Sequence, residues 1–322
     1  CALPLRKLFL KHLPTAMTDS TACRYGVIGH PIAHSRSPWI HARFAEQKQQ
    51  NLTYEAIESA PEDFAGTLAR LKKQGYSGVN VTVPFKHEAF AAANSHTNRA
   101  TLAQAANTLM WQREGRKTTL HADNTDGPGL IRDVVFNAGF VFGRLPVLLL
   151  GAGGAAAGVL SSLIAVCPAL VVVANRTREK AQELIERHYH WANMHSVALA
   201  ACSLDDVLSP THYLSSLPDQ FNLVINATSS SLHGQALQFP INRLTHDGML
   251  YDMMYGPAAN DFLSPARAHG RLARDGLGML VEQAALSFAL WRNTTPPRTA
   301  PVLQELRALI NAESTQTAPE KA

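Results

Sequence analysis

The sequence predicts an α/β fold of two domains, the second of them doubly wound. Its 322 residues exceed what one small core requires and suffice for two domains. Strand-like and helix-like segments alternate in two separate series, one from residue 24 and one from about residue 146. Such alternation is typical of a mostly parallel sheet that helices cover on both faces. We therefore expect two α/β domains with a cleft between them.

The first series opens with a strand, "RYGVIG" from Arg24, followed by the loop "HPIAHSRSP" and a helical segment at 39–49. "LTYEAIE" at 52–58 reads as a strand. "PEDFAGTLARLKKQG" at 61–75 reads as a helix, with proline near its start and glycine after its end. These segments would form the first part of the N-terminal domain.

The strand that follows, "NVTVPFK" at 80–86, carries polar groups on one face. Its period-two pattern separates Val79, Val81 and Val83 from Asn80 and Thr82. We expect the valine face to be buried and the other face to offer hydrogen-bonding groups. Pro84 lacks an amide donor and should end the strand, which would leave Lys86 just past its tip, where catalytic groups often lie.

The second series begins in a stretch without charge at 145–175, "LPVLLLGAGGAAAGVLSSLIAVCPALVVVAN". Its apolar character would also suit a membrane span. Glycines and a proline, however, divide it into a strand, a glycine loop, a helix and a second strand. A parallel strand that is buried on both faces has a continuous apolar sequence. We therefore expect no membrane partner. The series continues with a helix at 177–188, with "FNLVINATS" and "GMLYDMMYG", and with the apolar-periodic helix in "DGLGMLVEQAALSFALW".

The glycine loop after the first of these strands has the spacing G-x-G-x-x-A, formed by Gly151, Gly153 and Ala156. The first glycine permits a tight turn, the second lets the backbone approach a pyrophosphate, and the alanine allows close packing of the helix. The free amides at the positive end of that helix would bind phosphate. The strand before the loop and the helix after it are the context that a dinucleotide site requires.

The choice of dinucleotide follows from the end of the next strand, "ANRTREK". An NAD site usually has an acid there for the ribose 2′-hydroxyl, whereas this chain has Asn175, Arg176 and Thr177. An arginine fork binds a 2′-phosphate that a carboxylate would repel. The predicted cofactor is therefore NADP (NADPH).

The overall charge argues for small ligands. The formal net charge is +4 and the basic residues form no long run, which suits small anionic ligands better than nucleic acid. The four cysteines are far apart and lack metal or disulfide spacing, so a reducing cytoplasmic location is expected. They are Cys1, Cys23, Cys167 and Cys202.

Taken in order, the motifs resemble the shikimate dehydrogenase family over residues 24 to 312. The matching segments are "GHPIAHSRSP", "NVTVPFK", "AANT", "DNTDG", "GAGGAAAG", "NRT", "INATS", "YDMMYGP" and "DGLGMLVEQAA". The resemblance implies NADPH-dependent, reversible reduction of 3-dehydroshikimate to shikimate, a step in the pathway to chorismate and the aromatic amino acids.

The resemblance also implies the roles of individual residues. It makes Lys86 and Asp126 the catalytic pair. The implied substrate-binding residues are Ser35, Ser37, Asn80, Thr82, Lys86, Asn107, Asp126, Tyr255 and Gln283. The implied cofactor-binding residues are Gly151, Ala152, Gly153, Gly154, Ala155, Asn175, Arg176, Thr177, Met253 and Gly276.

The chemistry of the two catalytic residues agrees with the resemblance. Hydride transfer to a ketone leaves an alkoxide, so a donor such as Lys86 has to deliver a proton to that oxygen. Asp126 would orient the ammonium and hydrogen-bond the substrate. The chain departs from the usual family pattern at two positions, His30 in place of Asn and Asn98 in place of Glu.

Other readings stay open at this stage. His30, His34 and His41 lie close in sequence, but prolines interrupt any helix that could align them, and no metal is expected. An enzyme of the same fold that uses quinate, with NAD or with both cofactors, is one alternative. A non-catalytic NADP-binding sensor is another, although it would not need both Lys86 and Asp126.

The predicted organisation has five parts. They are an extension at 1–23 that is non-native or disordered, a substrate-binding domain at 24–125, an NADP-binding Rossmann domain at 126–275, helices at 276–312 that return to the substrate domain, and a disordered tail at 313–322. The expected assembly is a monomer or a homodimer.

Overall fold

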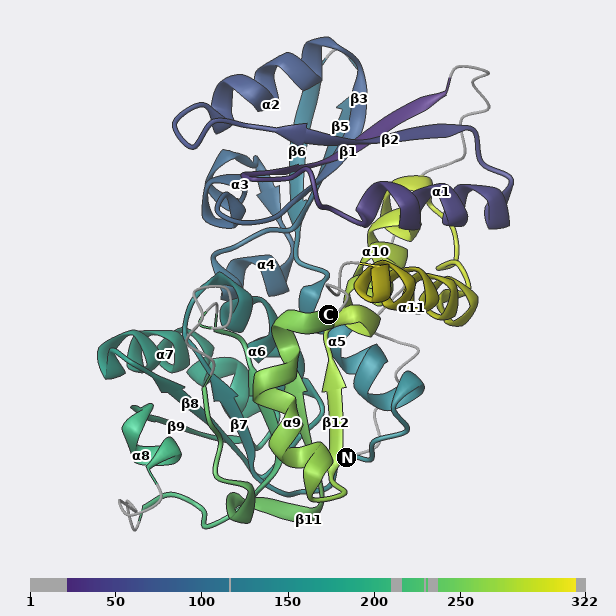
Figure 1. Cartoon of the computed structure of the whole chain (residues 1–322). Coiled ribbons are helices and arrows are strands. Elements are labelled where there is room, and N and C mark those ends of the chain that lie inside the picture. The colour runs from purple at the N-terminus through teal and green to yellow at the C-terminus, as the bar shows by residue number, and fades with distance from the viewer. Residues whose placement is uncertain (1–21, 116, 210–215, 229, 231–236, 317–322) are drawn as a thin grey trace. The chain divides into compact units, whose positions relative to one another are not determined.

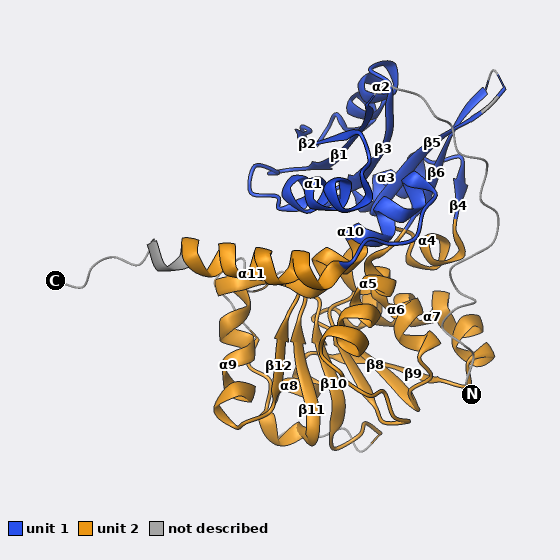
Figure 2. Ribbon diagram, turned by 90° about the vertical axis from the view of Figure 1, so that its right-hand side faces the viewer, with its two compact units in different colours: residues 1–96, 106–123, 284–298 blue, residues 97–105, 124–283, 299–322 orange. Residues whose placement is uncertain are grey.

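The computed structural model describes residues 22–115, 117–209, 216–228, 230 and 237–316. Figure 1 shows the secondary structure along the chain. Figure 2 shows the two compact units: unit 1 comprises residues 1–96, 106–123 and 284–298, and unit 2 comprises residues 97–105, 124–283 and 299–322. Each unit is described by itself. Residues 1–21 of the predicted extension and 317–322 of the predicted tail lie outside the described residues.

Unit 1 is built on a six-stranded sheet with the order β2-β1-β3-β5-β6-β4. Strands β1, β2 and β3 are parallel, as predicted, whereas β5 is antiparallel to both β3 and β6. The sheet is therefore mixed, and the sequence analysis did not foresee the antiparallel hairpin of β5 and β6. The strands are β1 (Cys23–Gly29), β2 (Leu52–Glu58), β3 (Tyr76–Val81), β4 (Ser95–His96), β5 (Thr108–Glu114) and β6 (Lys117–Asp123).

Helices accompany these strands much as the sequence predicts. Helix α2 starts close to Pro61 and ends just before Gly75, the two positions that punctuate the segment in the sequence. The helices of this part of the chain are α1 (Ser37–Lys48), α2 (Phe64–Lys73), α3 (Lys86–Ala92) and α4 (Asn98–Ala103). Val79, Phe85 and Leu109 are fully buried in one hydrophobic cluster with α2 residues.

Unit 2 contains an all-parallel sheet of six strands with the order β12-β11-β10-β7-β8-β9. In chain order this is the doubly wound arrangement 3-2-1-4-5-6, which confirms the predicted Rossmann-type domain. The strands are β7 (Val147–Leu150), β8 (Leu170–Asn175), β9 (Ala198–Ser203), β10 (Phe221–Asn226), β11 (Leu244–Asp252) and β12 (Leu272–Asp275).

The helices of unit 2 cover both faces of its sheet. Helices α5, α6 and α7 contribute to one hydrophobic cluster, and α8 and α9 contribute to the other. The α-helices after β6 are α5 (Asp126–Arg132), α6 (Gly154–Ala165), α7 (Arg178–Met194), α8 (Asp205–Leu208), α9 (Asn260–Ala268), α10 (Leu277–Arg292) and α11 (Thr299–Gln316). The short helical turns are the π-helix η2 (Asp133–Asn137) and the 3-10 helices η4 (Ile241–Arg243) and η5 (Gly256–Ala259).

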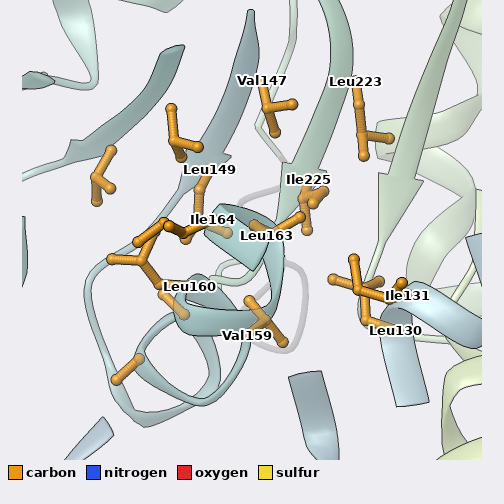
Figure 3. Packing of buried hydrophobic residues seen from close by; sticks show 14 of the residues in the cluster. Leu130, Ile131, Val147, Leu149, Val159, Leu160, Leu163, Ile164, Leu223 and Ile225 are labelled. Carbon is orange, nitrogen blue, oxygen red and sulfur yellow. The ribbon is translucent and has the colours of Figure 1, made fainter. Parts of the chain in front are cut away.

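Strand β7 explains the uncharged stretch of the sequence. Val147 and Leu149 belong to one hydrophobic cluster, and Leu148 and Leu150 belong to the other, so the strand is buried on both faces. Figure 3 shows Val147 and Leu149 packed with leucines of α6 and with Leu223 and Ile225 of β10. The strand, helix, strand interpretation of this stretch is confirmed, and among the described residues no helix is long and apolar enough to span a bilayer.

The division into compact units differs from the predicted domain ranges. Residues 97–105 and 299–316 lie in unit 2, and the boundary within α10 falls between 283 and 284. Helix α11 lies in unit 2, where Arg307 pairs with Asp275 of β12 and Thr299 hydrogen-bonds Glu282. Helix α11 also continues to Gln316, past the predicted start of the tail at 313.

Candidate active site

The glycine loop leaves the sheet of unit 2 at its topological switch point. Strand β7 lies between β8 and β10, and Leu150 is aligned with Ala174 on one side and Asn226 on the other. The Gly151 amide donates to the Ala174 carbonyl over 2.7 Å, which directs the chain out of the strand. In open parallel sheets, ligands bind at this edge, outside the carboxyl ends of the strands.

The backbone geometry of the loop is compatible with the role predicted for each position. Gly151 has φ of +107°, and a Cβ there would lie 3.2 Å from the Ala227 backbone. Gly153 has an extended backbone, and a Cβ there would meet no protein atom within 4 Å. Ala156 is fully buried. Helix α6 starts at Gly154, so the positive end of its dipole faces this loop, and no side chain caps its first amides.

The basic end of β8 lies at the same edge of the sheet. Asn175 is the last residue of the strand, and its Nδ2 donates to the Thr177 carbonyl over 2.8 Å. Arg176 is exposed, and Thr177 precedes the first turn of α7. The structure thus brings the predicted pyrophosphate loop and the predicted 2′-phosphate residues to one edge, and these residues fit a bound NADP.

Two further predicted cofactor residues, Met253 and Gly276, are neighbours at the next strands along this edge. The Met253 amide donates to the Asn226 carbonyl over 2.9 Å, and the Gly276 amide donates to the Met254 carbonyl over 2.8 Å. A Cβ on Gly276 would collide with the Met253 carbonyl, so only glycine allows this approach. Tyr255, a predicted substrate residue, follows in this segment and is half-buried.

Asp252 and Asn226 form a buried pair that the sequence analysis did not single out. Asn226 Nδ2 donates to Asp252 Oδ2 over 3.0 Å, and the Met254 amide donates to Asp252 Oδ1 over 2.8 Å. Burial raises the pKa of Asp252 to about 6, against these hydrogen bonds. The pair holds the ends of β10 and β11 together under the loop that carries Met253. The signal available in the sequence was that a polar residue ends each of these apolar strands, Asn226 in β10 and Asp252 in β11.

Besides Tyr255, two unit 2 residues predicted to bind substrate lie on α5 and α10. Asp126 begins α5 and is 5% exposed, and its amide donates to Asn124 Oδ1 over 3.1 Å. Gln283 of α10 is also buried, and Thr125 Oγ1 lies 3.5 Å from its Oε1. A Cβ on Gly129 would lie 2.7 Å from the Cβ of Gln283, which shows how closely the two helices approach.

Buried acids support these helices, and the sequence analysis missed them. Asp133 accepts from Arg274 and from the Tyr251 hydroxyl, and Glu282 accepts from Arg132 Nε over 2.6 Å. Both acids are nearly inaccessible to solvent. An acid inside an apolar-periodic helix, as Glu282 is, signals a buried charge that needs a partner.

In unit 1 the two predicted substrate-binding serines flank the start of α1. Ser37 is its first residue and is buried, and its amide donates to Ser35 Oγ over 3.3 Å. Glu58 fixes the preceding loop, because its carboxylate accepts from the Ile32 amide over 3.0 Å and lies 2.6 Å from His30 Nδ1. The start of a 12-residue helix beside two hydroxyls suits a carboxylate ligand.

Asn80 and Asn107 are brought together on neighbouring segments of the unit 1 sheet. Asn80 Nδ2 donates to the Asn107 carbonyl over 3.0 Å, and Asn80 Oδ1 accepts from the Tyr54 hydroxyl over 2.8 Å. Both asparagines are buried. Asn80, one residue of the polar face of "NVTVPFK", is therefore engaged in an internal network, which the sequence analysis did not foresee.

The strand tip differs from the prediction in one respect. Val79 and Val81 are buried, but Val83 is 63% exposed, so the expectation that all three valines face the core was wrong. The ladder ends at Val81, and the Val83 carbonyl accepts from the His30 amide over 3.1 Å. The period of the strand therefore does not continue to residue 83.

Lys86 lies past this tip, at the first position of α3. Its side chain is half-buried, and its carbonyl accepts from the Ala106 amide over 2.8 Å, which places it beside the segment of Asn107. Thr82 is half-buried, and its amide donates to the Ile28 carbonyl over 2.9 Å. The structure thus groups Thr82, Lys86 and Asn107 in unit 1, next to Asn80.

The histidines considered as metal ligands have other surroundings. His30 pairs with Glu58, and His41 is buried with its ring stacked 4.0 Å from that of Tyr54. Burial lowers the pKa of His41 to about 3. Within the described part of the chain, no three His, Cys, Asp or Glu side chains form a group that could hold a metal ion.

Comparison with known proteins identifies the parts of the chain. Residues 27–109 match the model of the shikimate dehydrogenase substrate binding domain, residues 140–233 match the shikimate/quinate 5-dehydrogenase model, and residues 276–307 match the shikimate 5′-dehydrogenase C-terminal domain. A shikimate dehydrogenase (NADP(+)) of Paracidovorax citrulli is 48% identical over 91% of this chain and 99% of its own length.

Solved structures agree with the sequence comparison. An Ael1 enzyme from Pseudomonas putida is 36% identical, with a TM-score of 0.75 over 88% of this chain and 98% of its own. A shikimate 5-dehydrogenase from Thermus thermophilus, solved in complex with shikimate, is 30% identical, with a TM-score of 0.72 over 90% of this chain and 99% of its own.

Proposed function

The chain belongs to the shikimate dehydrogenase family, and we propose that Lys86 and Asp126 are its catalytic residues. It is an NADP-dependent oxidoreductase that interconverts 3-dehydroshikimate and shikimate, in the pathway to chorismate and the aromatic amino acids. The observation that carries the residue assignment is the position of Lys86. It begins a helix at the tip of a polar strand, beside Asn107.

The proposed division of labour follows from the chemistry of the reaction. NADPH, when bound, supplies the hydride that reduces the substrate carbonyl carbon. Lys86, as an ammonium, donates a proton to the carbonyl oxygen and so prevents an alkoxide from accumulating. In the oxidative direction the neutral amine accepts that proton. Asp126, buried at the start of α5, accepts a hydrogen bond from a ring hydroxyl and orients the substrate.

The other substrate contacts are assigned by the same resemblance. Ser35 and Ser37 bind the carboxylate, aided by the start of α1. Asn80, Thr82 and Asn107 bind ring hydroxyls, and Asn80 Nδ2 also donates to the Asn107 carbonyl. Tyr255 and Gln283 complete the substrate-binding residues from unit 2.

NADP would be held by residues along the carboxyl edge of the unit 2 sheet. Gly151 to Ala155 offer backbone amides to the pyrophosphate, and Asn175, Arg176 and Thr177 bind the adenosine end. Met253 and Gly276, neighbours at this edge, would contact the nicotinamide end. The exposed Arg176 and the open space beside Gly153 support this placement.

Lys86→Ala tests the proton-transfer role. Loss of a general acid or base typically costs about 10²-fold to 10⁴-fold in rate, so kcat should fall by that order while the KM for shikimate changes far less. Lys72→Ala, which removes an exposed lysine of α2, is the matched control. Absorbance of reduced nicotinamide gives both constants. A normal kcat for Lys86→Ala would overturn the proton-transfer role of Lys86.

Arg176→Ala tests the 2′-phosphate assignment. A hydrogen bond to a charged group contributes about 1.5–3 kcal/mol, so the KM for NADP should rise by at least about tenfold and the KM for NAD should hardly change. Arg187→Ala, which removes an exposed arginine of the following helix α7, controls for net charge. Equal losses for both cofactors would defeat the assignment.

Substrate preference is measured with shikimate and quinate, each with NADP and with NAD. Turnover of shikimate with NADP alone is expected, and efficient turnover of quinate with NAD would contradict the specificity. We further propose that the enzyme acts in the cytoplasm as a monomer or a homodimer, which light scattering of the purified protein would distinguish from larger assemblies.

A further inference from the structure

A buried network of polar side chains lies among the proposed substrate residues of unit 1. This polar network consists of Tyr54, Asn80, Asn107, Thr108 and Ser287, and all of them except Tyr54 are less than a tenth exposed. Ser287 comes from α10, more than 170 positions along the chain from its nearest partner in the network, Thr108. Buried polar groups need their hydrogen bonds, so such a network restrains the orientation of each member.

Asn80, at the centre of the polar network, is held by both ends of its amide. The Tyr54 hydroxyl donates to its Oδ1 over 2.8 Å. Its Nδ2 lies 3.0 Å from Ser287 Oγ and 3.2 Å from Thr108 Oγ1. The carbonyl oxygen therefore faces β2 and the amino group faces α10, so rotation of this amide would break contacts at both ends.

The second asparagine receives its orientation through Thr108. The Thr108 hydroxyl donates to Asn107 Oδ1 over 2.9 Å, and Thr108 Oγ1 lies 2.8 Å from Ser287 Oγ. A hydroxyl has one proton to donate, so when Thr108 donates to Asn107, Ser287 is the donor in the hydroxyl pair. Thr108 therefore engages the oxygen end of the Asn107 amide, and the amino end points away from Thr108.

We propose that Ser287 is a positioning residue for the substrate, acting through Thr108 and Asn80 on the amide of Asn107. The inference rests on the proposed function, because that function assigns Asn107 to a ring hydroxyl of the substrate. Without the Ser287 hydroxyl, Thr108 Oγ1 keeps only Asn80 of these two donors, and Asn80 Nδ2 loses an acceptor. The side chain of Thr108 is then held less firmly in the orientation that donates to Asn107. The apparent affinity for substrate is then the intrinsic affinity multiplied by the fraction of molecules in which Asn107 keeps the competent orientation.

Ser287→Ala is the first variant, and Ser59→Ala is its matched control. Ser59 is also a buried serine of unit 1 whose hydroxyl lies 3.1 Å from a threonine hydroxyl, that of Thr67, but it lies outside the polar network. We expect Ser287→Ala to raise the KM for shikimate about tenfold, because about one molecule in ten would keep the competent orientation of Asn107. Its kcat and its KM for NADP should stay within about threefold. Ser59→Ala should lower the melting temperature to a similar extent and leave all three constants unchanged.

A double-mutant cycle with Asn107→Ala separates positioning from a general loss of stability. If Ser287 acts through Asn107, then Ser287→Ala should change the KM less than about twofold when Asn107 is already alanine. Thr108→Val keeps the shape of the side chain but removes the hydroxyl, and it should reproduce the increase in KM. It also provides the test if Ser287→Ala does not fold.

The possible results discriminate between the claims. The inference is overturned if Ser287→Ala and Thr108→Val behave like Ser59→Ala, or if the effects of Ser287→Ala and Asn107→Ala on KM multiply. An unchanged KM in Asn107→Ala alone, with active wild-type enzyme, overturns the assignment of Asn107 to the substrate. A wild-type protein that does not oxidise shikimate with NADP overturns the proposed function itself, and the inference with it.

Discussion

Gly153 offers a test of the cofactor site that can be separated from the stability of the fold. A Cβ at this position would meet no protein atom within 4 Å, and the backbone, with φ of −82°, is open to any residue. Gly153→Ala should therefore be accommodated by the protein alone. The methyl group would instead occupy the space into which the pyrophosphate of NADP is proposed to approach.

The expected magnitudes follow from this geometry. Alanine at an N-cap costs up to about 1 kcal/mol relative to glycine, and the stiffer unfolded chain returns about 0.4–1 kcal/mol, so the free energy of unfolding should change by less than about 1 kcal/mol. Overpacking of one methyl against a bound ligand costs about 1–3 kcal/mol. The KM for NADP should thus rise between about fivefold and about 150-fold.

The assay measures the KM for NADP and the KM for shikimate by absorbance, together with the melting temperature. Gly151→Ala is the contrasting variant, because φ of +107° and a Cβ 3.2 Å from the Ala227 backbone make alanine unfavourable in the protein itself. It should lower the melting temperature as well as the affinity for NADP. Gly153→Ala with an unchanged KM for NADP would refute the placement of the pyrophosphate at this loop.

Two further predictions concern buried acids of unit 2. Asp133→Ala should lower the free energy of unfolding by about 3–5 kcal/mol, because it leaves Arg274 and the Tyr251 hydroxyl without this partner. Glu46→Ala, which breaks an exposed ion pair, is the control and should cost less than about 1 kcal/mol. Equal losses in urea unfolding would contradict the reasoning. Burial raises the pKa of Asp252 from 3.8 to about 6, so the folded protein holds this proton more tightly than the unfolded chain, and the stability this provides is lost as pH rises through about 6. Relative to Asp252→Asn, the wild type should lose up to about 3 kcal/mol between about pH 4 and about pH 7, and a difference that is independent of pH would contradict the shift.

The architecture of the NADP-binding part could be predicted because its signals are local. A continuous apolar run such as 147–150 indicates a strand buried on both faces, and the glycine spacing at 151–156 indicates the turn and helix that follow. The cofactor preference likewise depended on a single residue type, the arginine at 176. These conclusions need only the geometry of neighbouring residues.

The mixed sheet of unit 1 was less accessible to this reasoning. The antiparallel hairpin of β5 and β6 was not identified. Val83 was predicted to be buried because the alternating pattern includes it, but the strand ends at Val81. A strand ends where its ladder partners end, and those partners come from other parts of the chain. The period alone therefore could not locate the boundary.

The sequence by itself determined the family, the two-part organisation and the residues whose chemistry suits hydride and proton transfer, because each depends on motifs of a few adjacent residues. Only the tertiary structure decided how those residues are supported. Asn80 meets Ser287, and Asp133 meets Arg274, across 207 and 141 positions of the chain. Such partners are chosen by the packing of helices against sheets, which brings together side chains that no local pattern relates.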